Sequence, residues 1–166
     1  MRKKLFGAKK ILHRIRINPG ERILELGPGS GYLTVEASKR AGDSGRLCCL
    51  DIQLKMIEKV RQKVIEEGLS NVGLVVGDAC QVPFKGSTFD STFLVTVFGE
   101  IRHRGQALKE LRRVVKSGGT LSVTELLPDP HYSLQRTTRS LCQKGGFVLE
   151  EAEGNFFQYT VNFRKA

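Results

Sequence analysis

The chain has 166 residues, 40% of them hydrophobic and 27% charged, which is typical of one soluble globular domain and not of a disordered segment. It has no apolar run near the roughly 20 residues that a membrane-spanning helix needs, and its charged N-terminus lacks the apolar stretch of a secretory signal, so we expect a cytoplasmic protein. Four cysteines without a CxxC pair and only three histidines argue against a metal site or a disulfide framework.

The net charge of +10 is concentrated at the N-terminus. Within residues 1–22, eight lysine and arginine residues accompany a single acid, Glu21. A basic surface attracts anions, which include nucleic acids, acidic lipid headgroups and charged substrates, and charge alone does not distinguish among them.

Short apolar runs alternate along the chain with segments of helical period, which is the pattern of a mostly parallel α/β sheet. The first 20 residues are expected to contain a basic amphipathic helix, because apolar residues recur three and four positions apart until a turn at Asn18-Pro19-Gly20. The later elements are expected as strands at 22–26, 46–50, 72–76, 89–98, 120–125, 147–151 and 156–164, and as helices at about 31–40, 54–65, 107–116 and 131–144.

A glycine-rich turn follows the first predicted strand. It reads Glu25-Leu26-Gly27-Pro28-Gly29-Ser30-Gly31 and precedes a predicted helix. A parallel sheet binds its ligand at the carboxyl ends of its strands, where glycines let the backbone approach a ligand and a helix points free N–H groups toward it. We therefore expect a cofactor-binding turn here.

The turn does not fit the two common nucleotide-binding motifs. The dinucleotide pattern G-x-G-x-x-G needs glycine or alanine where this chain has Tyr32, and a tyrosine there would block close packing of helix and strand. The phosphate-binding Walker pattern needs a Gly-Lys-Ser/Thr that is absent.

Three predicted strands have an acid at or just after their carboxyl ends: Glu25, Asp51 and Asp78. A carboxylate at the end of the second strand can accept hydrogen bonds from both hydroxyls of a ribose, and the carboxylate after the third strand can accept one from an exocyclic amine. Three nearby carboxylates would repel a pyrophosphate, so adenosine joined to a cationic amino acid suits them better.

Four segments in this order resemble a known family: ELGPGSG at 25–31, Leu50-Asp51, Gly77-Asp78-Ala79, and LRRVVKSGG at 111–119. The chain resembles class I S-adenosylmethionine-dependent methyltransferases over roughly residues 10–164. It is most similar to the branch that includes the ubiquinone/menaquinone-biosynthesis methyltransferases (methyltransferase type 11). The resemblance implies a Rossmann-like three-layer sandwich, with a mostly parallel seven-stranded sheet and an antiparallel last strand.

The resemblance also implies a set of cofactor-binding residues. Near the methionine part and the sulfonium it places Glu25, Gly27, Gly29, Gly31 and Thr96. Around the adenosine it places Asp51, Ile52, Asp78 and Ala79. The product would be S-adenosylhomocysteine. In domain terms, we expect one methyltransferase domain, with a basic helix at 1–20, a cofactor-binding core at 21–125 and acceptor-side elements at 126–166.

The acceptor is much less constrained by the sequence. Methyl transfer is an in-line displacement from an activated cofactor, so positioning supplies most of the acceleration and a general base is needed only if the acceptor carries a proton. Glu100 and His103 are candidates for catalytic contact, although a solvated helix start explains them as well. The segment 96–100 lacks the Asp/Asn-Pro-Pro-Tyr/Phe pattern, which by family resemblance argues against methylation of exocyclic base nitrogens.

Three functions remain open. A small-molecule methyltransferase is favoured, because the chain has no added domain to hold a macromolecule. An RNA or protein methyltransferase would use the basic N-terminal segment, and a non-catalytic cofactor-binding partner would use the first helix as its interaction face. Peripheral membrane contact of that helix and a homodimer that completes the acceptor pocket are both compatible with the sequence.

Overall fold

The computed structural model describes the backbone of residues 2–166 and the side chains of residues 7–166. The basic side chains of Arg2, Lys3 and Lys4 therefore lie outside the described residues. The strands are β1 (Arg22–Leu26), β2 (Arg46–Asp51), β3 (Val72–Val76), β4 (Phe89–Val95), β5 (Val115–Leu126), β6 (Phe147–Gly154) and β7 (Gln158–Lys165). The helices are α1 (Arg2–Ile15), α2 (Thr34–Ala41), α3 (Leu54–Glu66), α4 (Arg104–Val114) and α5 (Gln135–Lys144). None of these helices combines the length and apolar character that a bilayer-crossing segment requires.

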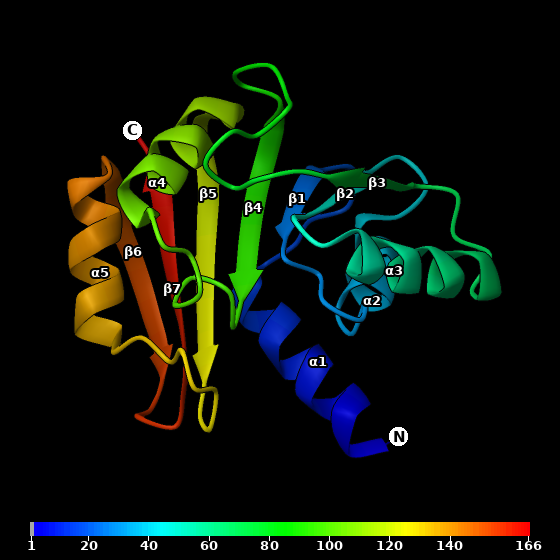
Figure 1. Cartoon of the computed structure of the whole chain (residues 1–166), viewed down its shortest axis with the longest axis horizontal. Helices are drawn as coiled ribbons and strands as arrows, with labels where there is room; N and C mark the ends of the chain where they lie inside the picture. The colour runs from blue at the N-terminus through cyan, green and yellow to red at the C-terminus, as the bar shows by residue number, and fades with distance from the viewer. Residues whose placement is uncertain (1) are drawn as a thin grey trace.

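The strands form one seven-stranded sheet in the order β3-β2-β1-β4-β5-β7-β6 (Figure 1). β1 to β5 pair in parallel, and β7 is antiparallel to both β5 and β6. The strand order reverses between β1 and β4, and a crevice opens at such a switch point outside the carboxyl ends of the strands. This topology confirms the predicted Rossmann-like sheet with its antiparallel last strand.

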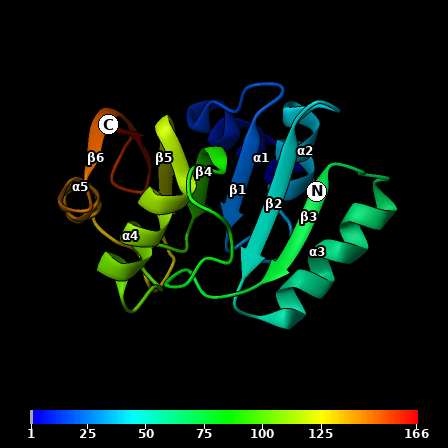
Figure 2. The ribbon, with the colours of Figure 1, turned by 90° about the horizontal axis from the view of Figure 1, so that it is seen from above.

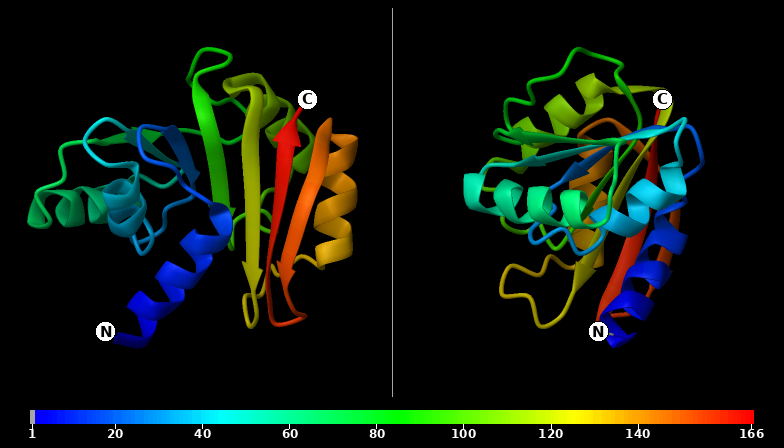
Figure 3. Two further views of the ribbon diagram at one scale, coloured as in Figure 1. Left: turned by 180° about the vertical axis from the view of Figure 1, so that it is seen from behind. Right: turned by 90° about the vertical axis from the view of Figure 1, so that its right-hand side faces the viewer.

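Helices cover both faces of the sheet and make the sandwich three-layered (Figures 2 and 3). On one face α1, α2 and α3 bury apolar side chains such as Leu12, Ala37 and Val60 against Phe93 of β4. On the other face α4 and α5 pack a second cluster, which includes Leu111, against β4 and β5. The parallel strands are thus covered on both sides, which explains why they read as continuous apolar runs in the sequence.

Several element boundaries differ from the sequence prediction by a few residues, and the starts of α5 and β5 differ most. α5 begins at Gln135 and not at residue 131, because Asp129 forms a turn in which its Oδ1 accepts from the N–H of His131 at 2.8 Å and its backbone carbonyl accepts from Tyr132. β5 begins at Val115, directly after α4, and its pairing with β4 shifts register before Thr120. The glycines at 118 and 119 therefore lie inside β5, and α4 ends at Val114 and not at residue 116.

We expect Phe93→Ala to lower the free energy of unfolding by roughly 3–5 kcal/mol, because the ring is 1% exposed in the middle of the sheet and its loss leaves a cavity. The control is Ile65→Ala on α3, whose side chain is 72% exposed and whose loss is expected to cost within about 0.5 kcal/mol. Urea denaturation followed by circular dichroism measures both. Equal destabilisation by the two variants would contradict this assignment of the core.

Candidate cofactor-binding site

A cavity of about 610 Å³ lies at the carboxyl ends of β1, β2 and β4, beside the segment that follows β3. Its volume falls in the range of sites for small molecules and cofactors. The predicted residues that line it are Glu25, Gly27, Gly29, Asp51, Ile52, Asp78, Ala79, Thr96, Glu100 and His103. The sheet therefore brings together side chains that are spread over nearly 80 positions of the sequence, from 25 to 103.

The glycine turn follows β1 and needs its glycines for two different reasons. Gly27, Gly29 and Gly31 all have positive φ, at 68°, 53° and 73°, a conformation that other residues rarely adopt. A methyl group on Gly27 would lie 2.5 Å from a methyl carbon of Val97, so this position is also closed by packing. Gly31 does not line the cavity. Its backbone faces α3, where Val60 lies 3.4 Å from the place of a Cβ.

Glu25 is the buried acid of the site, with a side chain that is 3% exposed. Its Oε2 accepts hydrogen bonds from the Thr34 hydroxyl at 2.7 Å and from the Cys49 thiol at 3.4 Å. Burial raises the pKa of Glu25 from 4.5 to about 7, although these two hydrogen bonds lower it. Both donors bind the same oxygen, which leaves Oε1 for a ligand. Sequence reasoning missed Thr34 and Cys49, because only the fold places them beside Glu25.

Asp51 and Asp78 each use one carboxylate oxygen to shape the backbone. Oδ1 of Asp51 accepts from the N–H of Gln53 at 2.9 Å, and Oδ1 of Asp78 accepts from the N–H of Cys80 at 2.8 Å. These turns fix the direction of each side chain, and the turn at Asp51 leaves its second oxygen to a ligand. Next to Asp51, the Ile52 side chain is 66% exposed, which is unusual for an apolar group that lines a cavity.

Thr96 has the most unusual backbone of the lining residues. Its φ is 55°, a region that β-branched residues avoid for steric reasons. Hydrogen bonds hold it there, since its N–H donates to the Thr124 carbonyl at 2.9 Å and its hydroxyl to the Val95 carbonyl at 2.7 Å. Strain of this kind concentrates at ligand sites, and here it turns the chain sharply between β4 and the segment that carries Val97.

Glu100 and His103 lie on the exposed side of the cavity. A second histidine approaches from the loop before α5, with His131 Nδ1 4.0 Å from Oε1 of Glu100. The N-terminal helix is also close, because a methyl group on Gly7 would lie 3.0 Å from the hydroxyl oxygen of Tyr32, which lines the cavity. The segments that carry Glu100 and His131 thus approach each other beside the cavity, and α1 approaches its lining at Tyr32.

Sequence reasoning missed one acid at the same sheet edge. Glu125 lies at the end of β5, is 1% exposed, and neither of its oxygens has a hydrogen bond of normal geometry within the described residues. Burial raises its pKa to about 7, although the nearby backbone of Gly99 and Ser133 lowers it. The available signal was its position, because Glu125 ends the fifth predicted strand as Glu25, Asp51 and Asp78 end or follow the first three.

Raised pKa values make the stability of the ligand-free protein depend on pH. Folded Glu25 keeps its proton up to about pH 7, whereas the unfolded chain releases it near 4.5, so the free energy of unfolding falls as pH rises through this window. We expect the decrease in the free energy of unfolding between pH 5 and pH 8 to be about 3 kcal/mol smaller in Glu25→Gln than in wild type. Urea denaturation at the two pH values measures this difference. The control, Glu58→Gln at an exposed position of α3, should keep it. An identical pH dependence in Glu25→Gln and wild type would contradict the burial.

We expect Gly27→Ala to be more destabilising than Gly68→Ala, although both place a side chain at positive φ at a cost of about 1–2 kcal/mol. No atom lies within 4 Å of a Cβ at Gly68, whereas Val97 blocks the one at Gly27 and should add about 1–3 kcal/mol. Thermal and urea denaturation measure the difference. Combining Gly27→Ala with Val97→Ala should recover the added part, and failure to recover it would locate the strain elsewhere.

A sequence model described as the ubiE/COQ5 methyltransferase family matches residues 2–140. Among curated relatives, the ubiquinone/menaquinone biosynthesis C-methyltransferase UbiE of Pseudomonas paraeruginosa is 34% identical over 110 residues, which are 66% of this chain and 43% of that protein. The protein of the same name from Laribacter hongkongensis is 34% identical over 148 residues, 86% of this chain and 59% of that protein. The chain thus spans less than two thirds of the length of these relatives.

Solved structures share the fold at lower sequence identity. A SAM dependent methyltransferase from Aquifex aeolicus matches with a TM-score of 0.91 at 22% identity, over 99% of this chain and 93% of that chain. The [4+2]-cyclase SpnF matches with a TM-score of 0.84 at 17% identity, over 95% of this chain and 79% of that chain. The fold therefore serves more than one chemistry, and the sequence match decides the family. The chain belongs to the ubiE/COQ5 methyltransferase family, and membership identifies S-adenosylmethionine as its cofactor.

Proposed function

We propose that this chain binds S-adenosylmethionine in the cavity at the carboxyl edge of the sheet and transfers its methyl group to a small-molecule acceptor. The observation that carries the proposal is the convergence of the glycine turn, the acids after β1, β2 and β3, and Thr96 on one cavity. Gly31 supports the turn from behind and is not assigned to the ligand.

The residues present fit this cofactor. An ammonium group is a suitable partner for Oε1 of Glu25, because a positive charge offsets the cost of ionising a buried carboxylate. Asp51 presents its second oxygen to ribose hydroxyls, and the exposed Ile52 beside it offers apolar surface to a flat base. Asp78 and Ala79 then lie at the edge of the adenine. Gly27 and Gly29 leave room for the methionine part of the cofactor, since neither has a side chain to occupy the space beside the turn.

When bound, S-adenosylmethionine supplies a methyl group that is already activated by the sulfonium. The protein then has to orient the acceptor in line with that methyl group and exclude water, and such positioning supplies up to about 7–11 kcal/mol in favourable cases. We assign orientation near the sulfonium to Thr96, which is fixed by its bond to Thr124. Glu100 and His103 are the groups that would take a proton from the acceptor, and they are required only if the acceptor carries one.

Two further observations support a small acceptor. The curated relatives are named C-methyltransferases of ubiquinone and menaquinone biosynthesis, so their acceptors are small molecules. The approach of α1 to Tyr32 also favours an acceptor pocket that the N-terminal helix helps to cover. A second subunit at the acceptor side and contact with a membrane surface remain predictions of the sequence.

We expect Asp51→Ala to weaken binding of S-adenosylhomocysteine by about 10- to 150-fold, because ribose hydroxyls lose a charged acceptor worth roughly 1.5–3 kcal/mol and the Gln53 turn is released. Isothermal titration calorimetry measures the affinity. Asp43→Ala removes an exposed acid from the turn between α2 and β2 and serves as the matched control, with unchanged affinity expected. Normal binding by Asp51→Ala would overturn the assignment of the cavity.

We expect the purified chain to transfer labelled methyl groups from S-adenosylmethionine to a small aromatic hydroxy compound such as a hydroquinone, and not to RNA. The chain is incubated with labelled S-adenosylmethionine and either a mixed phenol and hydroquinone library or total RNA, at low and at high salt. Mass spectrometry detects the methylated product. Methylation of RNA alone, weakening steeply with salt, would replace the small acceptor by a nucleic acid. Cofactor binding without transfer to either would favour a partner-dependent subunit.

A further inference from the structure

The loop between β3 and β4 carries part of the proposed adenine site but contains little structure of its own. Residues 77–88 are fully described, and they form no helix. The bonds within the loop include those from the N–H of Gln81 to the Asp78 carbonyl at 3.0 Å and from the N–H of Phe84 to the Val82 carbonyl at 2.9 Å. Buried backbone groups need partners, so the remaining ones in this loop have to be bound from outside.

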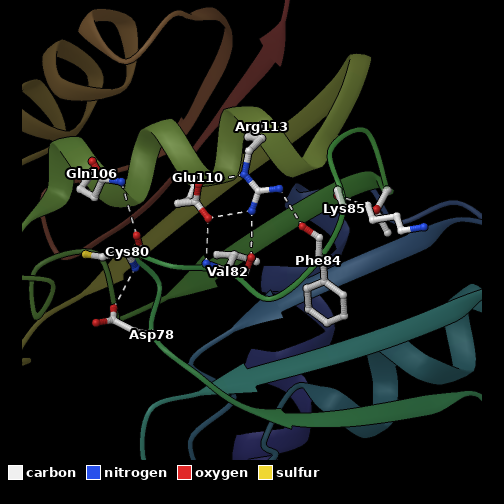
Figure 4. Close-up of polar contacts among 9 residues, drawn as sticks. Asp78, Cys80, Val82, Phe84, Lys85, Gln106, Glu110 and Arg113 are labelled. Atoms are coloured by element: carbon white, nitrogen blue, oxygen red, sulfur yellow. Dashed lines mark hydrogen bonds and ion pairs between the residues drawn. The ribbon is translucent and has the colours of Figure 1, made fainter.

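One face of α4 supplies these partners (Figure 4). Gln106, Glu110 and Arg113 are spaced four and three positions apart, which places them on one side of the helix. Gln106 Nε2 donates to the Cys80 carbonyl at 3.5 Å, and Glu110 Oε2 accepts from the N–H of Val82 at 2.8 Å. The guanidinium of Arg113 donates to the carbonyl oxygens of Val82 at 2.8 Å and Phe84 at 2.7 Å.

Glu110 and Arg113 also bind each other, with both nitrogen-to-oxygen contacts between 2.7 and 2.9 Å. The hydrogen bond from Arg113 lowers the pKa of Glu110, and the same bond raises the pKa of Arg113, so both stay charged. The guanidinium of Arg113 makes four hydrogen bonds here, two to the carboxylate and two to carbonyls, whereas an ammonium has only three N–H donors. Val82 is 3% exposed, so its backbone bonds lie away from water and are costly to leave unmade.

The contacts extend from this pair to the adenine side of the cavity. The carbonyl of Cys80 is held by Gln106, and the N–H of the same residue donates to Oδ1 of Asp78 (Figure 4). At the far end of the loop, the N–H groups of Ser87 and Thr88 donate to the carbonyls of Arg113 and Val114 at 2.9 and 2.7 Å. The loop is thus fastened to α4 along most of its length, with Asp78 and Ala79 at the end that follows β3.

We propose that Glu110 and Arg113 are positioning residues that hold the loop so that Asp78 and the neighbouring backbone read the hydrogen-bonding edge of adenine. The inference rests on the proposed function, because it assigns base selectivity to that same site. Neither residue lines the cavity, so neither touches the ligand. Their effect on binding passes through the loop backbone alone.

The test compares S-adenosylhomocysteine with S-inosylhomocysteine, in which the base carries an oxygen in place of the exocyclic amine and an N–H in place of the adjacent ring nitrogen. Isothermal titration calorimetry of wild type should show a clear preference for the adenosine form. Arg113→Gln should weaken binding of the adenosine form roughly 10-fold or more, the equivalent of one charge-assisted hydrogen bond. The ratio of the two affinities should fall toward one. Glu110→Gln should act in the same direction.

The matched control is Arg112→Gln. Arg112 is the preceding residue of the same helix turn, is exposed, and donates to the Gly146 carbonyl at 3.2 Å and not to the loop. It should leave both affinities unchanged. Unchanged selectivity in both Arg113→Gln and Glu110→Gln, or an equal loss for both ligands, would overturn the inference, since a merely structural role does not change the ratio.

Hydrogen exchange of the ligand-free protein separates this inference from the proposed function. Exchange of the amides in residues 78–86 should be faster in Glu110→Gln than in wild type and Arg112→Gln, while the core strands remain protected. Unchanged exchange in the loop would overturn the inference whatever the ligand result. If the wild-type chain bound neither ligand, the proposed function would be contradicted. The hydrogen-exchange comparison would then still decide whether Glu110 and Arg113 order the loop. If Arg113→Gln does not fold, Glu110→Gln provides both readouts.

Discussion

The parallel pairing of β1 with both β2 and β4 is the constraint on which the site depends. Leu26 of β1 pairs with Leu50 of β2 and with Leu94 of β4, so three strands end at nearly the same level. Each strand ends in backbone that leaves the sheet, and the side chains that follow converge on one cavity. The glycine turn also stays close to the end of β2, because the N–H of Gly27 donates to the Leu50 carbonyl at 2.8 Å.

Burial divides the acids of this edge into two kinds. Asp51 and Asp78 are open to solvent on one side and spend one oxygen each on a turn. Glu25 and Glu125 are almost completely buried, and burial raises the pKa of both to about 7. A buried carboxylate is costly to ionise unless a positive group or several donors accompany it. An edge of this kind selects a cationic ligand over an anionic one, which agrees with a sulfonium cofactor.

The second face of the molecule supports the site from outside the cavity. α4 packs on β4 and β5 through Leu108 and Leu111, and its polar face is directed to the loop that follows β3. The apolar and polar residues of α4 therefore lie on different faces of the helix and have different roles. Its apolar residues belong to the core, whereas Glu110 and Arg113 replace the hydrogen bonds that the loop would make if it were regular structure. The site thus depends on residues from nearly every element of the first 126 positions.

The sequence by itself determined the order of strands and helices, the glycine turn and the acids at strand ends, because these follow from local patterns of apolar residues, turns and caps. It also predicted residues from each of the strand ends that border the cavity, since acids at the ends of parallel strands must share an edge. Only the tertiary structure decided that Gly31 faces α3, that Glu125 is buried and that α5 begins after the Asp129 turn. These features depend on contacts between residues far apart in the chain, and no local pattern records which partner a side chain will meet after folding.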